Sequence, residues 1–233
     1  MSYEDELELE NLAISDAKSY YKKALISFCE AFLGLKKNRS SWSIVKLYYS
    51  IFYSIRADIL LENYFLVRCG GFYYSTIKNG AKFNKFSSKK AKGDHQLTSY
   101  FYHKLHIERK NIDPLQDGFI DEILPYFWLM SQREKINYQL KDFSDPSIVD
   151  CLKKPATYIK NGKESYLLNM YKLADDYIYC FDHEHACLAI PFCKIQQISR
   201  KLKIKDSTII LTDNLIKHIN SMECDTLLKH IDL

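Results

Sequence analysis

The chain has few of the two residue types that form tight turns, with 7 glycines and 5 prolines among 233 residues. This scarcity argues against a β-sandwich or a β-barrel, which needs many tight turns, and favours long helices. No apolar run approaches the ~18–20 residues that span a bilayer. Charge of one sign is not in large excess either, since 33 Lys and Arg against 29 Asp and Glu give a formal charge of +4.

The residues that are present are typical of a folded protein. Hydrophobic residues make up 47% of the chain and charged residues 27%, which excludes a disordered or low-complexity sequence. The length allows one large domain, or one domain with a smaller appendage. The first ten residues include five acidic side chains, whereas a signal peptide begins with positive charge and an apolar stretch. A cytoplasmic location is therefore expected.

Seven cysteines are spread along the chain, at positions 29, 69, 151, 180, 187, 193 and 224. Their odd number, their wide spacing and the lack of a secretory signal predict reduced thiols rather than a disulfide framework.

Two long helices are predicted in the first third of the chain. Apolar residues recur at three- and four-residue spacing over residues 8–35 and again over 42–64, which is the pattern of an amphipathic helix. Ser40 and Ser41 are suitable N-caps for the second helix. Because the connection is short, the two helices should lie antiparallel.

The helical periodicity breaks over residues 65–93. Phe72–Tyr74 and the pair Asn79-Gly80 predict a small β-hairpin. The stretch contains no acidic residue and seven basic ones: Arg68, Lys78, Lys82, Lys85, Lys89, Lys90 and Lys92. The first six are candidate nucleic-acid-binding residues, because cations contact phosphates and the aromatic rings between them stack on bases. The alternative is a hairpin whose rings pack on the helices while its lysines face solvent.

Helical patterning returns at residues 94–105 and 117–140. Pro125 should kink the second of these helices or mark its true first turn. Asp142–Pro146 has turn chemistry and is the best internal boundary. Beyond it the pattern predicts a short strand at 177–181 and helices at 165–176, 190–202, 207–222 and 225–230.

The sequence thus predicts a mainly α fold, an antiparallel helical bundle with a small β-hairpin insertion and a helical C-terminal extension. Residues 1–143 would form the bundle, including the basic aromatic insertion at 65–93. Residues 144–233 would form a mixed, mostly helical extension. The sequence leaves open whether this extension is a separate domain or completes the bundle.

Two segments carry a family resemblance. Trp42–Arg56 reads WSIVKLYYSIFYSIR, and Arg133–Tyr138 reads REKINY. The first is similar to a tyrosine- and alanine-rich helix with the pattern YYAxFxAARALL, and the second lies where an Arg, four to six intervening residues and a His are usual. In this order the two segments resemble the HEPN family of all-helical domains, found in bacterial toxin–antitoxin and anti-phage systems. The likeness covers residues 8–140, and elements near Pro191 also resemble the YaaC-like branch of HEPN-type proteins.

The resemblance implies a HEPN-like bundle and a metal-independent ribonuclease site, in which two protomers line a shared cleft with Arg and His. An Arg fork holds phosphate, and a His with a pKa near 6.5 transfers protons. Carried over, Arg133 is the phosphate clamp and Tyr138 occupies the position of the His. Because a tyrosine with a pKa near 10 is a poor general base at neutral pH, the site is predicted to be degenerate.

In such a degenerate site, Arg133 and Asn137 would still bind a phosphate or a partner's carboxylate, since residues four apart share a helix face. The alternative for Arg133 is a structural role, in which it pairs with a carboxylate at a helix interface. His103, His106 and Arg109 also share one face, and either histidine could replace the missing one. A histidine pair at the surface or the edge of the core is the alternative.

No metal or cofactor is predicted. Cys180, His183, His185 and Cys187 have zinc-ligand side chains, but four ligands within eight residues lack the usual distant second pair. No phosphate-binding loop, serine nucleophile elbow or H-E-x-x-H helix occurs.

Two functions from different classes follow. The preferred one is a degenerate HEPN-type binding or regulatory subunit of a bacterial anti-phage defence or toxin–antitoxin assembly. It would have a protein partner from the same operon, with Tyr49, Tyr53 and Arg56 as partner-binding residues, RNA as a further ligand, and a homodimer implied by the resemblance. The acidic N-terminus is a candidate docking strip for a basic partner. The alternative is a metal-independent HEPN endoribonuclease that uses Arg133 with a histidine from elsewhere.

Overall fold

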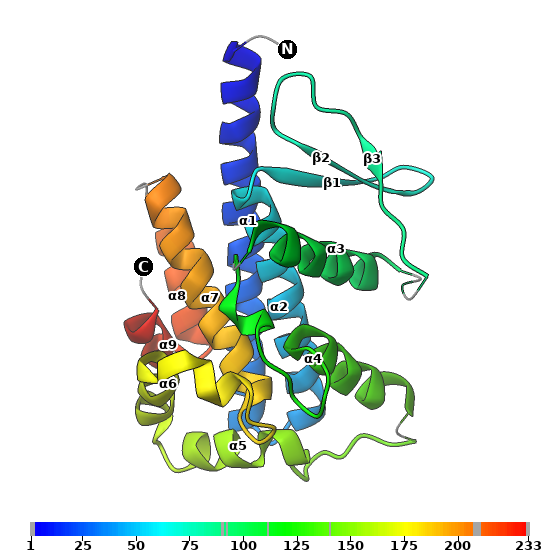
Figure 1. Cartoon of the computed structure of the whole chain (residues 1–233). Helices are drawn as coiled ribbons and strands as arrows, with labels where there is room; N and C mark the ends of the chain where they lie inside the picture. The colour runs from blue at the N-terminus through cyan, green and yellow to red at the C-terminus, as the bar shows by residue number, and fades with distance from the viewer. Residues whose placement is uncertain are drawn as a thin grey trace.

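The structure is a computed structural model, which describes residues 3–89, 91, 93–110, 112–139, 141–206 and 211–231. It confirms a mainly α fold with a small antiparallel sheet (Figure 1). None of its helices, over the described ranges, is long and apolar enough to cross a membrane. The elements are α1 (Tyr3–Lys36), α2 (Ser40–Leu61), β1 (Tyr64–Arg68), β2 (Phe72–Thr76), β3 (Asn84–Lys85), α3 (Asp94–Arg109), η1 (Pro114–Gln116), α4 (Pro125–Glu134), η2 (Lys135–Gln139), η3 (Asp150–Leu152), α5 (Lys153–Lys160), α6 (Glu164–Leu173), η4 (Asp175–Cys180), α7 (Ala186–Lys205), α8 (Asp213–Ser221) and α9 (Asp225–His230).

Helices α1 and α2 form the predicted antiparallel pair, and they cross closely near their connection. A Cβ atom added to Gly34 of α1 would lie 2.4 Å from Oγ of Ser43 in α2. That hydroxyl donates to the Ala31 carbonyl at 2.8 Å and also contacts the Arg39 carbonyl at 2.9 Å. Glycine at position 34 therefore allows the two backbones to approach.

The predicted capping of α2 is wrong. Ser40 and Ser41 lie inside its first turn, and Arg39 at the cap position makes no side-chain cap bond. Asp145 takes that role from a distant loop, because its Oδ1 accepts from the Ser41 backbone N–H at 3.1 Å and contacts Ser40 Oγ at 3.2 Å. A carboxylate at a helix N-terminus is favourable for the helix dipole.

The insertion forms a three-stranded antiparallel sheet with strand order β1-β2-β3. The turn between β1 and β2 contains Gly70, whose φ of +58° suits glycine. Asn79-Gly80 lies in the longer connection from β2 to β3, so the predicted pairing across it is confirmed, and β1 adds a strand that was not predicted. The sheet lies beside the upper part of α1 (Figure 1).

Helix α4 begins at Pro125. Of the two expectations for this proline, a kink or the first turn of the helix, the second is confirmed. The α-helix ends at Glu134 and continues as the π-helix η2. A π turn pairs residues five apart rather than four. This change of period alters which side chains lie beside Arg133.

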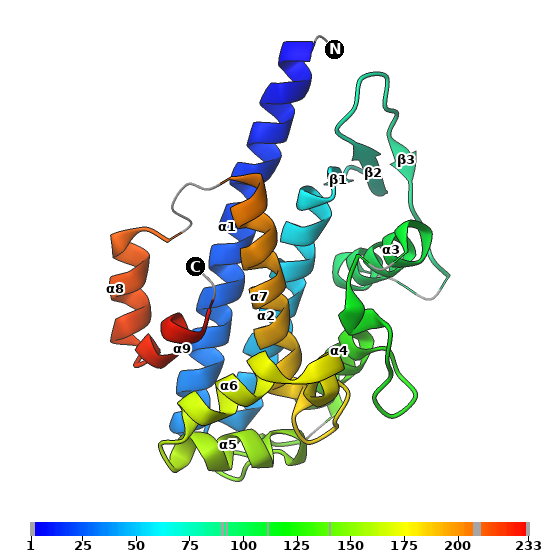
Figure 2. The same cartoon turned by 60° about the vertical axis from the view of Figure 1, so that its left-hand side comes forward.

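The C-terminal part of the chain contributes the helix α7 to the middle of the bundle. In Figure 2, α7 lies in front of α1 and α2, while α5 and α6 cover the lower end of the bundle. Nearly all of α7 is buried except its last turn, and one hydrophobic core includes residues from both the N-terminal and the C-terminal segments.

In the C-terminal segment, one predicted element is absent and another is present in a shorter form. The strand predicted at 177–181 is wrong, because the 3₁₀ segment η4 occupies these positions, with left-handed backbone at Asp176 and Tyr177. The helix predicted at 207–222 is confirmed from Asp213 to Ser221 as α8, and residues 207–210 lie outside the described residues.

A buried charge cluster joins four of these elements at the centre of the molecule. Lys194 of α7 is fully buried, and its Nζ lies 2.6 Å from Asp58 Oδ2 of α2 and 2.8 Å from Asp113 Oδ2, just before η1. The hydroxyls of Tyr102 and Tyr126 donate to these carboxylates from α3 and α4. The cluster therefore fixes α3 and α4 relative to α2 and α7.

Burial alone would raise the pKa of Asp58, but the positive charges of Lys194 and Lys201 outweigh it and hold the pKa below its ordinary value. Burial and the neighbouring carboxylates raise the pKa values of Tyr102 and Tyr126 well above their ordinary value, so both phenols stay protonated and can donate. Pairing of this kind is what allows charges to remain in a protein interior.

Candidate functional site

The candidate site is built on the aromatic face of α2. Tyr48 is buried, and Tyr49, Phe52 and Tyr53 are half-buried on the adjoining stripe. Ring centroids are 5.7 Å apart for Tyr48 and Tyr49 and 6.0 Å apart for Tyr49 and Tyr53. Residues three and four apart share a helix face, so these rings form one continuous surface along the helix.

His95, in the first turn of α3, packs on this surface. Its Nδ1 lies 2.9 Å from the Tyr48 hydroxyl, and its ring stacks on Phe52 with centroids 4.1 Å apart. Burial and the positive charge of Arg133 lower the pKa of His95, although Asp94 opposes them. The imidazole is therefore neutral at neutral pH, with one nitrogen engaged by Tyr48.

Arg133, near the end of α4, completes the cluster. Its Cζ lies 5.2 Å from the centroid of the Tyr48 ring and 5.6 Å from that of Tyr138. Its Nε is buried without a hydrogen-bond partner in the described part of the chain. No described carboxylate pairs with this guanidinium. We call Tyr48, His95, Arg133 and Tyr138 the His95–Arg133 cluster.

The electrostatics of the cluster centre on Tyr48. Burial raises the pKa of Tyr48, and Tyr49 and Glu134 add to the effect while Arg133 opposes it. The phenol is therefore protonated at neutral pH and can donate to His95. A half-buried guanidinium on two ring faces gains cation–π energy. Its N–H groups can still donate hydrogen bonds to a ligand or to water.

The π-helix η2 explains which neighbour Arg133 has. From α-helical geometry, Asn137 was expected to share its face with Arg133. The π turn of η2 follows Arg133 in the chain. Its longer period places Tyr138, five residues after Arg133, on the same face, and the observed ring contact of Arg133 is with Tyr138. Tyr138 is 73% exposed, so one side of the cluster is open to solvent, while Asn137 is half-buried beside it.

A groove of about 330 Å³ continues the aromatic surface toward the sheet. It brings the predicted partner-binding residues Tyr53 and Arg56 together with Tyr20 and Lys23 of α1, which the sequence interpretation missed. Arg56 donates to the Tyr20 hydroxyl at 3.1 Å, and Lys23 Nζ lies 5.3 Å from the centroid of the Tyr20 ring. The groove therefore presents two cations on aromatic faces.

The basic residues of the insertion are at the surface. Lys78, Lys82, Lys85 and Lys89 are exposed, and Lys90 lies outside the described residues. Arg68 is exposed and pairs with Asp94 at 2.9 Å.

Most rings of the insertion face inward. This agrees with the alternative interpretation, in which the rings pack on the helices while the lysines face solvent. Tyr74 and Phe86 pack on Phe101 of α3, with centroids 4.7 and 5.5 Å away. Phe83, 60% exposed, is the exception. The rings therefore anchor the sheet, and the solvated lysines supply positive potential rather than a stacking platform.

The other histidines singled out in the sequence have separate partners. His103 contacts Gln116 at 3.0 Å, and His106 contacts Asp117 at 3.0 Å. The histidine that shares Tyr48 with Arg133 is His95. It was missed because its role comes from the packing of α3 on α2, which no local spacing reveals.

The Cys180–Cys187 segment holds no clustered ligand set. His183 contacts Asp121 at 2.7 Å, and His185 contacts the Tyr171 hydroxyl at 2.9 Å. Over the described ranges, no three His, Cys, Asp or Glu side chains are grouped as a metal ion would require.

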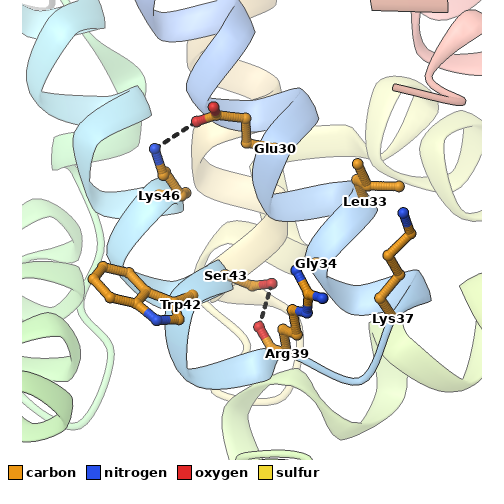
Figure 3. Close-up of a pocket in the computed structure, with 8 residues that line it drawn as sticks. All are labelled: Glu30, Leu33, Gly34, Lys37, Arg39, Trp42, Ser43 and Lys46. Carbon is orange, nitrogen blue, oxygen red and sulfur yellow. Dashed lines mark hydrogen bonds and ion pairs between the residues drawn. The ribbon is translucent and has the colours of Figure 1, made fainter. Parts of the chain in front are cut away.

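A second hollow, of about 230 Å³, lies at the α1–α2 turn (Figure 3). Lys46 and Glu30 pair across it at 2.6 Å, and Trp42 forms one wall. Trp42 also contacts Phe143, with centroids 6.0 Å apart. The ion pair satisfies one of the cations of this hollow, whereas Arg133 has no ion pair with any described carboxylate.

Comparisons of the chain with protein families, curated proteins and solved structures find no match. The resemblance of Trp42–Arg56 and Arg133–Tyr138 to the HEPN family therefore stays a prediction.

Proposed function

We propose that this chain is a binding subunit that takes single-stranded RNA at the His95–Arg133 cluster, without cleaving it. The observation that carries the proposal is the guanidinium of Arg133, half-buried between two rings, with its Nε buried and without a partner among the residues that the structure describes. A buried donor left unsatisfied costs about 1–3 kcal/mol. A phosphodiester would satisfy it, because its oxygens match the guanidinium fork.

The surroundings of Arg133 fit a single strand better than a duplex. Tyr138 is open to solvent, and Tyr49 and Tyr53 form a half-buried aromatic surface next to Tyr48. Unpaired bases stack on such rings regardless of sequence. Lys23 and Arg56 in the adjoining groove and the exposed lysines of the insertion would contact further phosphates.

The resemblance to the HEPN family supports the wider setting of the proposal. On this resemblance we propose that the chain acts in a bacterial anti-phage defence or toxin–antitoxin assembly, with a protein partner from the same operon. Tyr49, Tyr53 and Arg56 are then the surface that partner and RNA would compete for. Co-purification with the products of neighbouring genes tests this setting, and a chain that recovers none of them contradicts it.

Binding of a labelled single-stranded RNA, measured by fluorescence anisotropy, tests the site. We expect Arg133→Ala to weaken binding about 10- to 100-fold, the loss typical of a charged hydrogen bond. Arg133→Lys should be intermediate because it keeps the charge and loses the fork. Lys203→Ala is the matched control, since Lys203 is an exposed cation near the end of α7. Equal losses in Arg133→Ala and Lys203→Ala would contradict the site.

A second candidate function, metal-independent RNA cleavage, is favoured by one observation. Neutral His95 contacts the same tyrosine as Arg133. In the tautomer that donates its Nδ1–H to the Tyr48 oxygen, its Nε2 could take a proton from a 2′-hydroxyl. Incubation of RNA with the protein and a chelator tests this. If cleavage occurs, His95→Asn should lower its rate 100-fold or more, and cleavage that survives this substitution rules out the assignment.

A further inference from the structure

Six of the seven cysteines are buried, and each contacts another cysteine. All seven are free thiols, and the exposed one is Cys69. The pairs are Cys29 with Cys224, Cys151 with Cys187, and Cys180 with Cys193. Each pair joins parts of the chain that are not adjacent in sequence, and two of the three pairs include a thiol of α7.

The Cys151–Cys187 pair has the most defined geometry. Cys187 donates its S–H to the sulfur of Cys151, with 3.2 Å between the two sulfur atoms. A disulfide brings sulfurs to about 2.05 Å, so a shift of little more than 1 Å would bring them to bonding distance. Cys151 belongs to the single turn η3, and Cys187 lies in the first turn of α7.

Residues close to Cys151 in the chain line a hollow at the surface. Asp150, directly before Cys151, and Lys153, two residues after it, line an open hollow of about 640 Å³. Cys151 itself is 2% exposed. Lys135 of η2 also lines this hollow.

We propose that Cys151 and Cys187 are a site of reversible oxidative modification, at which a peroxide converts the two thiols into a disulfide. The sulfur of the first thiol attacks one peroxide oxygen, so that an S–O bond forms, the O–O bond breaks and water leaves with the thiol proton. The second sulfur then attacks the sulfenic sulfur, so that the S–S bond forms, the S–O bond breaks and a second water leaves. Two thiols and one peroxide give one disulfide and two waters.

The disulfide would fasten α7 to the segment that leads into α5. It would close a loop of the 35 residues between the two cysteines, and closing such a loop restricts the unfolded chain. The midpoint of thermal unfolding should therefore rise by about 5–10 °C.

The test uses the full chain carrying Cys69→Ser, which removes the exposed thiol. The protein is treated with hydrogen peroxide, free thiols are alkylated, and peptides are mapped by mass spectrometry with time. We expect a peptide linking Cys151 and Cys187 before any link between Cys29 and Cys224. A dithiol reductant should reverse the link.

The buried Cys29–Cys224 pair is the internal control for this order. If it links as fast as Cys151–Cys187, or if no Cys151–Cys187 link forms while peroxide oxidises free cysteine in the same buffer, the proposal is overturned. The Cys187→Ser variant on the same background should show no rise in the unfolding midpoint after treatment. The peptide map does not depend on the stability of that variant.

Discussion

At the scale of the residue, Lys194 shows how a charge can be held in a protein interior. Its ammonium is wholly buried and lies against two carboxylates and the Tyr102 hydroxyl. Removing one partner of such a set leaves a buried charge uncompensated. This costs more stability than replacing the whole set with apolar residues. The cluster also holds α3 and α4, which carry His95 and Arg133, so it fixes the geometry of the candidate site.

We expect Lys194→Met to lower the free energy of unfolding by about 3–5 kcal/mol, because Asp58 and Asp113 would stay buried without their shared cation. Urea denaturation followed by circular dichroism measures this. Lys203→Met, on the exposed end of the same helix, is the control and should change stability by about 0.5 kcal/mol or less. Adding Asp113→Asn to Lys194→Met should recover part of the loss, and a Lys194→Met protein as stable as the parent would contradict the argument.

Histidines give the molecule a dependence on mildly acid pH. Burial lowers the pKa values of four of them, which are His95, His103, His185 and His230. As pH falls through the ordinary histidine value of about 6.5, the unfolded chain takes up protons that the folded chain does not, so folding becomes less favourable.

The free energy of unfolding should therefore be constant above about pH 7.5 and fall between about pH 7 and 5. Urea titrations at stepped pH measure this. The His95→Asn variant should show a shallower fall, because one of the four groups no longer titrates. A stability that rises over the same interval would contradict the shifted pKa values.

The sequence interpretation included Arg133 and Tyr138 in the candidate site but did not include His95 or Lys194. Both missed residues gain their roles from contacts between helices. Lys194 did leave a signal, since it follows Ile190 and Cys193 and precedes Ile195 within an apolar helix. A lone charge on such a face, with Asp58 in a similar position on α2, could have been interpreted as a buried pair.

At the scale of the element, the period of the apolar residues predicted most helices well. It placed both ends of α1, α2 and α3 within five residues of their observed bounds, and α9 at its observed bounds. It failed where the determinant lies elsewhere in the chain or changes the period. Asp145 caps α2 from a loop, η2 adds a π turn after Glu134, and η4 replaces the strand predicted at 177–181.

The close crossing of α1 and α2 depends on the lack of a side chain at Gly34. We expect Gly34→Ala to destabilise the protein by about 1–3 kcal/mol, because the new methyl group would overlap Ser43 Oγ. Thermal and urea unfolding measure it. Gly93→Ala is the control, since its Cβ would meet no atom within 4 Å.

Ser43→Ala should relieve part of the overlap. The double variant Gly34→Ala/Ser43→Ala is then expected to lose less stability than the sum of its single variants. Strict additivity would show that the two residues do not oppose one another across the crossing.

At the scale of the whole molecule, the C-terminal segment supplies a central part of the core. Helix α7 buries residues from Ala186 to Leu202 within the same hydrophobic cluster as α1 and α2. It also supplies the cation for Asp58 and Asp113. The turn at 142–146, which the sequence suggested as a boundary, carries the cap of α2.

We expect a fragment of residues 1–143 to lack a cooperative unfolding transition. Without α7 it would expose the inner faces of α1 and α2 and leave two buried carboxylates without their lysine. Circular dichroism with temperature and limited proteolysis measure this. The full chain should unfold in one transition, and a fragment that melts cooperatively would instead show that residues 1–143 fold alone.

The length of α1 has a practical consequence for spectroscopy. Its first buried residue is Ala13, and Tyr3–Leu12 extend past the bundle in Figure 1. At 1.5 Å per residue, these ten residues reach about 15 Å. A fluorophore attached at the start of α1 would therefore lie away from quenching side chains of the bundle. Because α1 is one continuous helix, the fluorophore would rotate together with the bundle. Such a label would report rotational diffusion of the entire particle, and any binding event that enlarges it, without touching the His95–Arg133 cluster or the cysteine pairs.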